Sequence, residues 1–313
     1  MRTGARTKRH IHIANEQQGH NMTMDPTSWS SCWLLGSQGL HQSRDGSEWN
    51  EVGASGYPVQ DLVRETERVL CATLWGLWEV GQAEAPWIQL HDETLTEVQS
   101  IVPRPGHPGV AAVSAYGLSF GNKSEHGTTR WISHAEGLTL NERFSNALLA
   151  LPECEDQWLV GTEQGVLIYD ETKDLWHRTE LSGHPCRALL FVHDRLWAGT
   201  DGNGIWQSTD GHNWSRAGSG LDDESIFALG ATQDQILAGS LRGICSGDGT
   251  SRWRRSGPAL LVSAIGAHPA SEGPWLAGAT PGGLWRSDDS GARWHQVGDF
   301  HTVRVILPPE ETA

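Results

Sequence analysis

Short apolar segments recur along the chain, and each is separated from the next by glycines and polar turn residues. Segment 186–217 shows the pattern most clearly. It contains four apolar or alternating runs, at 186–191, 196–199, 204–208 and 214–217. Runs of this length that are bounded by Gly, Asp and Asn predict β-strands. Segment 186–217 therefore predicts a four-stranded antiparallel meander.

The same unit recurs seven times, at intervals of about 40 residues. A tryptophan closes every unit: Trp49, Trp87, Trp131, Trp176, Trp214, Trp253 and Trp294. A repeat of this length that holds four short strands is typical of a β-propeller blade and leaves no room for helices. We predict an all-β protein, a seven-bladed β-propeller of four-stranded antiparallel blades with almost no helix.

The two ends of the chain indicate how the ring closes. Segment 27–31, before the first unit, is polar and irregular, whereas 303–307, after the seventh unit, matches innermost strands such as 59–63. We therefore predict that a C-terminal inner strand completes the N-terminal blade, which removes an open sheet edge. Residues 29–313 then form a single propeller domain, and the polar residues 1–28 form a disordered tail.

Four units carry a Ser-x-Asp turn before the closing tryptophan. The residues are Ser43, Asp45 and Trp49; Ser208, Asp210 and Trp214; Ser246, Asp248 and Trp253; and Ser287, Asp289 and Trp294. An aspartate can accept hydrogen bonds from the backbone of the turn that follows, and the nearby glycine allows a left-handed backbone. The indole can return across the hairpin and pack between sheets. The pattern predicts a structural role for these residues and no metal site.

This turn resembles the Asp-box, or BNR, repeat. The segments that precede it, such as 199–206, resemble the blades of sialidase-like and photosystem-assembly-factor-like propellers. The resemblance covers roughly residues 32–307. It implies the propeller fold but leaves the function open, because such propellers include hydrolases, receptors, assembly factors and lectins.

A sialidase of this superfamily is expected to carry three arginines, a Tyr–Glu pair and an acid–base Asp. The usual Arg-Ile-Pro segment is absent, and none of Tyr57, Tyr116 and Tyr169 lies on a predicted inner strand. Another glycoside hydrolase needs two carboxylates about 5 to 9 Å apart. The candidates are Asp61, Glu97, Glu142, Asp222, Asp223 and Glu224, and nothing in the sequence pairs them.

One position of the inner strands has a distinctive composition. It is occupied by Gln60, Gln99, Asn146, Arg187, Phe227, Ser263 and Arg304. Six of the seven are polar, and the two arginines supply the only charges. We expect these residues to form a ring at the mouth of the channel, where they can hold a carboxylate, a sugar or a chain terminus. The open alternative is that they only solvate a water-filled channel.

Residues 119–145 form the longest interval between units, and an insertion on a rigid ring is either a recognition loop or plain solvated chain. A lectin-like function would require exposed tryptophans outside the closing position. The candidates are Trp75, Trp78, Trp206 and Trp285.

Charge and composition narrow the classes of partner. The formal net charge of −15 disfavours nucleic acid, and no apolar run is long enough for a membrane helix. The five cysteines show no CxxC spacing, and the N-terminus has no apolar signal segment, which together favour a cytoplasmic location. His10 and His12 lie in the polar tail, where solvation is the simpler interpretation. No cofactor is indicated, and a monomer is expected.

The sequence therefore favours a non-catalytic binding or assembly scaffold that presents a ligand-binding or protein-binding surface at the mouth of the channel. The alternatives are a glycoside hydrolase and a lectin-like carbohydrate binder. The first would require two converging carboxylates and the second exposed indoles.

Overall fold

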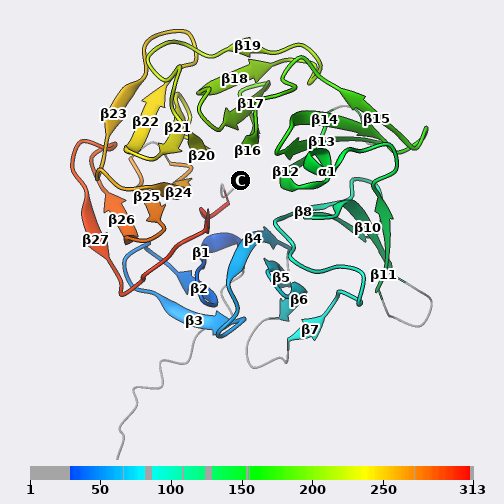
Figure 1. Ribbon diagram of the computed structural model, residues 1–313. Coiled ribbons are helices and arrows are strands. Elements are labelled where there is room, and N and C mark those ends of the chain that lie inside the picture. Colours follow the sequence, from blue (N-terminus) through cyan, green and yellow to red (C-terminus); the bar gives the residue numbers. More distant parts are fainter. Residues whose placement is uncertain are drawn as a thin grey trace, which may run out of the picture.

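The computed structural model describes residues 29–310 except 66, 82–86, 108, 124–128, 153, 155 and 271. Within this part of the chain, seven four-stranded antiparallel sheets stand in a ring around a central channel (Figure 1). The predicted seven-bladed β-propeller is confirmed. The predicted tail, residues 1–28 with His10 and His12, lies outside the described residues.

Each blade runs from an innermost strand beside the channel to an outermost strand at the rim. In that order, blade 1 holds β28 (Val305–Leu307), β1 (Trp33–Gly36), β2 (Leu40–Ser43) and β3 (Asn50–Gly53), and blade 2 holds β4 (Val59–Arg64), β5 (Arg68–Thr73), β6 (Gly76–Gly81) and β7 (Ile88–Gln89). Blade 3 holds β8 (Ser100–Pro103), β9 (Gly109–Ser114), β10 (Gly117–Lys123) and β11 (Thr129–His134). Blade 4 holds β12 (Ser145–Ala150), β13 (Gln157–Thr162), β14 (Gly165–Asp170) and β15 (Leu175–Arg178).

The remaining blades repeat this order. Blade 5 holds β16 (Cys186–Val192), β17 (Arg195–Thr200), β18 (Ile205–Ser208) and β19 (Ser215–Arg216). Blade 6 holds β20 (Ile226–Ala231), β21 (Ile236–Ser240), β22 (Gly243–Gly247) and β23 (Arg254–Ser256), and blade 7 holds β24 (Val262–Ala267), β25 (Trp275–Ala279), β26 (Gly283–Ser287) and β27 (His295–Val297). The described helices are the single turns η1 (Trp29–Ser31) and α1 (Leu140–Arg143).

The ring closes as the sequence predicts. The last strand, β28, pairs antiparallel with β1, and Val305 lies opposite Gly36. The guanidinium of Arg64, on the neighbouring inner strand β4, donates hydrogen bonds to the carbonyls of Cys32, at 2.7 Å, and Pro308, at 2.9 Å. Segments from both ends of the described chain are thereby tied to blade 2. Because β1 pairs with β28 on one side and β2 on the other, it has no free edge, and β28 takes the innermost position of blade 1.

The hydrophobic core is divided among the seven junctions between neighbouring blades. Each junction holds one apolar cluster with one closing tryptophan, which comes from the higher-numbered blade except at the junction of blades 7 and 1, where Trp49 of blade 1 supplies it. The indole of Trp131 donates a hydrogen bond of 2.8 Å to the carbonyl of Leu90, in the preceding blade. Because a blade buries its apolar faces only against its neighbours, the blades stabilise one another around the ring.

The Ser-x-Asp turns are closed by their own side chains. Asp210 Oδ1 accepts hydrogen bonds from the backbone N–H groups of His212, at 2.9 Å, and Asn213, at 2.8 Å. Ser208 Oγ accepts from the N–H of Gly211, whose φ of 76° favours glycine. Asp45, Asp248 and Asp289 accept from their own turns in the same way. These carboxylates therefore stabilise the turns of the hairpins that contain them.

The long interval at 119–145 contains regular structure in addition to loop. Part of it is the extended hairpin of β10 and β11, and part is α1, which lies between blades 3 and 4 (Figure 1). Glu142 of α1 is buried, and both of its carboxylate oxygens accept from Arg178, at 2.6 and 2.9 Å. This ion pair holds α1 against blade 4. The tip of the hairpin, 124–128, is outside the described residues.

Candidate binding site in the central channel

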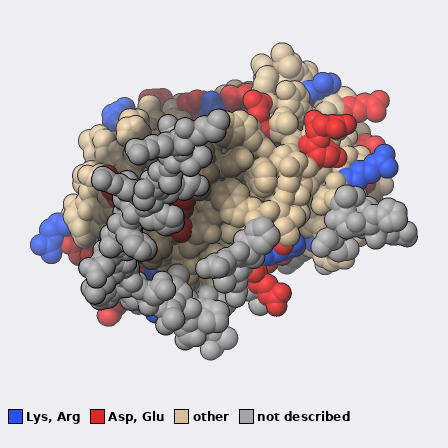
Figure 2. All heavy atoms as spheres, turned by 90° about the horizontal axis from the view of Figure 1, so that it is seen from below, with Lys and Arg blue, Asp and Glu red and all other residues tan. Residues whose placement is uncertain are grey.

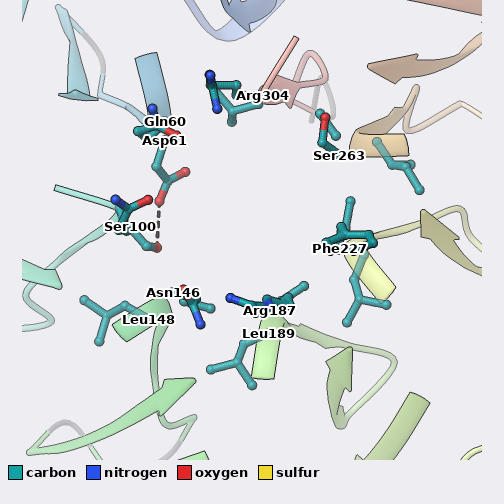
Figure 3. Close-up of a pocket in the computed structure, with 18 of the residues that line it drawn as sticks. Gln60, Asp61, Ser100, Asn146, Leu148, Arg187, Leu189, Phe227, Ser263 and Arg304 are labelled. Atoms are coloured by element: carbon teal, nitrogen blue, oxygen red, sulfur yellow. Dashed lines mark hydrogen bonds between the residues drawn. The ribbon is translucent and has the colours of Figure 1, made fainter. Parts of the chain in front are cut away.

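The inner strands enclose a cavity of about 280 Å³ on the axis of the ring. All seven residues of the inner-strand position that the sequence singled out line it: Gln60, Gln99, Asn146, Arg187, Phe227, Ser263 and Arg304. Figure 3 shows the labelled members of this ring arranged around the opening, each from a different inner strand. The repeat thus brings together residues that lie at opposite ends of the chain, such as Gln60 and Arg304.

A β-bulge lies at this position in five of the seven inner strands. The pairing register shifts between Cys186 and Ala188 in β16, so that Arg187 has no partner across the strand pair. The same shift occurs in β4, β12, β20 and β24, at Gln60, Asn146, Phe227 and Ser263. A bulge leaves one residue outside the ladder and turns its side chain away from the regular alternation. The bulges therefore direct these five side chains towards the channel.

Arg187 is already paired. Its guanidinium forms ion pairs with Glu163, in the turn between β13 and β14, and with Asp201, in the turn between β17 and β18. The hydrogen bond from Ser225 and the charge of Arg187 lower the pKa of Asp201, against the effect of burial. The amide of Asn146 also donates to Glu163, at 3.1 Å. Arg187 therefore links blades 4 and 5 through these ion pairs, and its role in holding a ligand stays a prediction.

Arg304 stands in a different environment. Among the described residues, no ion pair involves Arg304. Its buried Nε has no hydrogen-bond partner, as is also the case for the Nε of Arg187. Gln60, on the adjacent inner strand, also carries a buried amide nitrogen without a partner. The backbone N–H of Arg304 pairs with Gly36, at 3.0 Å, which fixes the residue at the edge of the ring. Buried donors without acceptors are rare in proteins, so this pair marks an incomplete site.

Asp61 lines the same cavity, next to Gln60, but its carboxylate is fully engaged. Oδ2 accepts from Ser100 Oγ, at 2.7 Å, and from the N–H of Ile101, at 2.9 Å, while Oδ1 accepts from the N–H of Leu62, at 2.9 Å. Figure 3 shows the bond to Ser100. Burial raises the pKa of Asp61, against the lowering effect of these hydrogen bonds. Asp61 thus joins blades 2 and 3 and is the only carboxylate among the described residues that line the cavity.

The channel opens on the side where the inner strands begin, which we call the mouth face. A second recess, of about 400 Å³, adjoins the cavity on this side and shares Gln99 and Asn146 with it. Large side chains stand exposed nearby in blades 2 to 4 and their connections: Trp75 at 57%, Tyr116 at 58%, Leu140 at 69% and Phe144 at 40%. Large exposed side chains on the face that holds a recess are typical of an interaction surface.

The other carboxylates considered for hydrolysis are not brought together in the cavity. Glu142 is paired with Arg178, and Glu224 is paired with Arg242 and Arg255. Glu97, Asp222 and Asp223 do not line the channel cavity. None of these other candidates therefore joins Asp61 in the lining of the cavity, and Glu142 and Glu224 are held in ion pairs.

The tryptophans proposed for sugar binding differ in exposure. Trp75 is exposed, whereas Trp78, Trp206 and Trp285 are partly buried against neighbouring core clusters. Trp78 packs against the rings of Tyr57 and Trp87. The indole stack that a lectin-like site would require is therefore reduced to one exposed tryptophan.

Sequence reasoning missed Glu163 and Asp201 as members of the site. A signal for them was present, because each follows the Thr that ends the second strand of its blade. Their backbone N–H groups make equivalent bonds to Phe144 and Pro185, the residues that precede the inner strands. Comparing this turn position across the units would have placed both carboxylates next to Arg187.

The described residues hold no group of three or more His, Cys, Asp or Glu side chains placed to bind a metal ion. The five cysteines are free thiols. None of the described helices has the length and apolar character needed to cross a membrane. Figure 2 shows one side of the ring, where acidic and basic side chains are interspersed and form no extended basic patch among the coloured residues.

No protein-family model matches this chain, and no curated protein matches its sequence. Solved structures do match its fold. The extracellular domain of a protein described as a hybrid two-component system from B. thetaiotaomicron is 14% identical, with a TM-score of 0.63, and the match covers 88% of this chain and 47% of that one. An ancestral GH74 enzyme is 15% identical, with a TM-score of 0.57, and the match covers 86% and 40% of the two chains.

The computationally designed Ika8 protein is 14% identical, with a TM-score of 0.55 and coverage of 80% of this chain and 90% of that one. The chain spans about half the length, or less, of the two natural proteins named above. At these identities the likeness shows the β-propeller fold alone.

Proposed function

We propose that this protein is a non-catalytic binding scaffold that engages a protein partner through the mouth face. The observation that supports this most directly is a recess of about 400 Å³, lined in part by Phe144, on the face where Trp75, Tyr116 and Leu140 are also exposed. Aromatic side chains are enriched at protein interfaces, where they supply large contact areas at low conformational cost. The rigid ring holds these residues in fixed positions.

The geometry of the acidic groups favours binding over glycoside hydrolysis. A hydrolase needs two carboxylates, of which the general acid must keep its proton near neutral pH. In the channel, Asp61 alone has a raised pKa, and its oxygens already accept three hydrogen bonds. At the mouth, Glu163 and Asp201 both form ion pairs with Arg187, which favours their ionised forms. Hydrolysis and lectin-like sugar binding remain the alternatives to be tested.

We also propose a distant relationship to the Asp-box propellers. The support is geometric: four turns of the same sequence pattern use an aspartate to accept bonds from their own backbone. The cytoplasmic location and the monomeric state stay predictions from the sequence.

Affinity capture from the lysate of the source organism, followed by cross-linking and mass spectrometry, tests the binding role. The protein is compared with a Trp75→Ser/Phe144→Ser variant of the mouth face. We expect a partner that is cross-linked to the mouth face of the unaltered protein and is lost with the variant. Both residues are exposed, so the substitutions are expected to leave the fold intact.

The matched control is a Leu175→Ser/Phe191→Ser variant. Leu175 and Phe191 are exposed to 48% and 39%, but they lie on an outer strand and at the far end of an inner strand. A partner kept by this control and lost by the mouth-face variant supports the proposal. Capture of the same proteins by all three forms, or of none by any, would overturn it and direct attention to glycan arrays and glycosidase substrates.

A further inference from the structure

The repeat allows a direct comparison of the two arginines in the channel. Each stands at the same inner-strand position and is flanked by two turns, one from its own blade and one from the preceding blade. For Arg187 these turns supply Asp201 and Glu163. For Arg304 the corresponding residues are Gln38 and Thr280, which carry no charge.

The equivalence of these turn positions is visible in the backbone. The N–H groups of Glu163, Asp201 and Thr280 each donate to the carbonyl of the residue that precedes an inner strand. In addition, Thr280 Oγ1 is occupied locally, since it bonds to Ser263 Oγ, at 2.9 Å, and to the carbonyl of Val303, at 3.1 Å. Neither turn therefore offers Arg304 an anionic partner.

The unpaired groups around Arg304 are all donors. The Nε of Arg304 and the Nε2 of Gln60 are buried and lack acceptors. They come from the neighbouring inner strands of blades 1 and 2 and line the same cavity (Figure 3). A guanidinium offers its N–H groups in a planar fork that matches a carboxylate, and such charge-assisted bonds are stronger than neutral ones.

We propose that Arg304 and Gln60 form a binding site for a carboxylate group inside the channel. This assignment rests on the proposed binding role of the mouth face and names the chemical group that the channel takes from a ligand. A cavity of about 280 Å³ admits a short carboxylic acid or the end of a peptide. Arg187 takes no part, because Glu163 and Asp201 already neutralise it.

Asp61 and Ser263 line the same cavity, but their side chains are already hydrogen-bonded within the protein. Asp61 contributes a negative charge to the same lining when it is ionised, which weakens the attraction for an anion, while its own oxygens are held by Ser100 and two backbone N–H groups. Ser263 Oγ bonds to Thr280 and to the carbonyl of Val303. The Nε atoms of Arg304 and Arg187 and the Nε2 of Gln60 are buried without acceptors, but of the two arginines only Arg187 has carboxylate partners among the described residues.

The test uses the full-length protein with ¹⁵N-labelled arginine and follows the Nε–Hε signals by NMR. The Arg304 and Arg187 signals are assigned with the Arg304→Gln and Arg187→Gln variants. Sodium acetate is titrated against sodium chloride at constant ionic strength. We expect acetate to shift the Arg304 signal in a saturable way and to leave the Arg187 signal unchanged.

Variants then separate the role of charge from that of shape. Arg304→Gln is expected to weaken acetate binding by at least about tenfold, and Arg304→Lys by less, since it keeps the charge but loses the planar fork. Gln60→Leu should also weaken binding. The fold of each variant is checked by near-ultraviolet circular dichroism. Unchanged affinity in a folded Arg304→Gln variant would overturn the site.

Two further probes distinguish the source of the carboxylate. Succinate represents a free small acid, and N-acetyl-tetraglycine represents a peptide C-terminus, with its C-terminal amide as the neutral control. Tighter binding of succinate assigns the site to a small metabolite, and tighter binding of the peptide acid assigns it to a partner's chain end. No shift of the Arg304 signal with acetate, succinate or the peptide acid would refute the proposal.

This result is independent of the test of the proposed function. A partner that is lost with Trp75→Ser/Phe144→Ser but kept by Arg304→Gln, together with no effect of any carboxylate, leaves the scaffold role standing and removes the carboxylate site. Saturable acetate binding at Arg304 without any captured partner would support the carboxylate site and overturn the scaffold role.

Discussion

The indole nitrogen of Trp253 donates a hydrogen bond of 2.7 Å to the carbonyl of Ala217, across the junction between blades 6 and 5. Trp253 is buried in the cluster that these two blades share. The contact links a residue near the outer edge of one blade to the last segment of the previous blade. Each junction of the ring holds an equivalent tryptophan, so the ring depends on side chains that lie far from the channel.

Replacement of Trp253 by alanine is expected to lower the free energy of unfolding by about 3–5 kcal/mol, because it removes a large buried ring and leaves a cavity. Trp253→Phe should cost less, since it keeps much of the packing but leaves the Ala217 carbonyl without its donor. Urea denaturation followed by circular dichroism measures both values. Trp75→Ala, at an exposed indole, is the control and should change stability by less than about 0.5 kcal/mol. Equal losses at Trp253 and Trp75 would show that the junction tryptophans have no special role in stability.

Asp210 is expected to make the protein less stable in acid. Burial raises the pKa of Asp210, but hydrogen bonds from Asn213, His212 and Ser208 outweigh it and lower the pKa to about 2. The folded protein therefore holds this carboxylate ionised where the unfolded chain, with a pKa of about 3.9, takes up a proton. The stabilisation is present above about pH 4 and is lost as the pH falls towards 2.

Unfolding curves between pH 2 and pH 6 test this dependence against Asp210→Asn, which keeps an acceptor for the backbone but cannot ionise. The difference in unfolding free energy between wild type and variant should shrink as the pH falls from 4 to 2. A difference that stays constant over this range would refute the assignment.

Asp61 should show the opposite dependence. Its pKa is raised by burial, so the folded state retains the proton at pH values where the unfolded chain has lost it. Stability is therefore expected to fall as the pH rises from about 4 through the folded pKa, relative to the Asp61→Asn variant. Thermal unfolding at a series of pH values compares the two proteins. A wild type that gains stability over Asp61→Asn with rising pH would contradict the assignment.

A double variant of Glu163 and Asp201 tests whether these two carboxylates prevent a ligand from binding to Arg187. In the Glu163→Gln/Asp201→Asn variant, Arg187 loses both ionic partners and acquires an environment like that of Arg304. Acetate is then expected to shift the Arg187 Nε–Hε signal as well as that of Arg304. The cost in stability should be modest, about 1 kcal/mol, since these side chains are partly exposed to solvent.

The matched control for this variant is Asp222→Asn, which removes a carboxylate that lies in a nearby connection and is paired with Arg216. It should leave the Arg187 signal insensitive to acetate. If the Arg187 signal also stays insensitive to acetate in the double variant, the two carboxylate partners are not what prevents acetate from binding there.

The sequence by itself determined the architecture. Seven units, each closed by a tryptophan from Trp49 to Trp294, and one spare strand at 303–307 permit one arrangement, a closed ring of seven blades, and the structure has it. The reason is that strand alternation and turn chemistry are local properties, and a repeat applies the same local solution seven times. The alignment of the repeats also predicted which residue of each inner strand lies on the channel.

The tertiary structure alone decided which of these residues are free. Arg187 and Arg304 are equivalent in the repeat, yet Arg187 forms ion pairs with Glu163 and Asp201, whereas Arg304 forms none with the described residues. It also separated Asp61 from the other candidate carboxylates and buried three of the four candidate tryptophans in part. Ion pairs between blades and the exposure of side chains depend on distances across the ring. A pattern along the chain carries no direct measure of those distances.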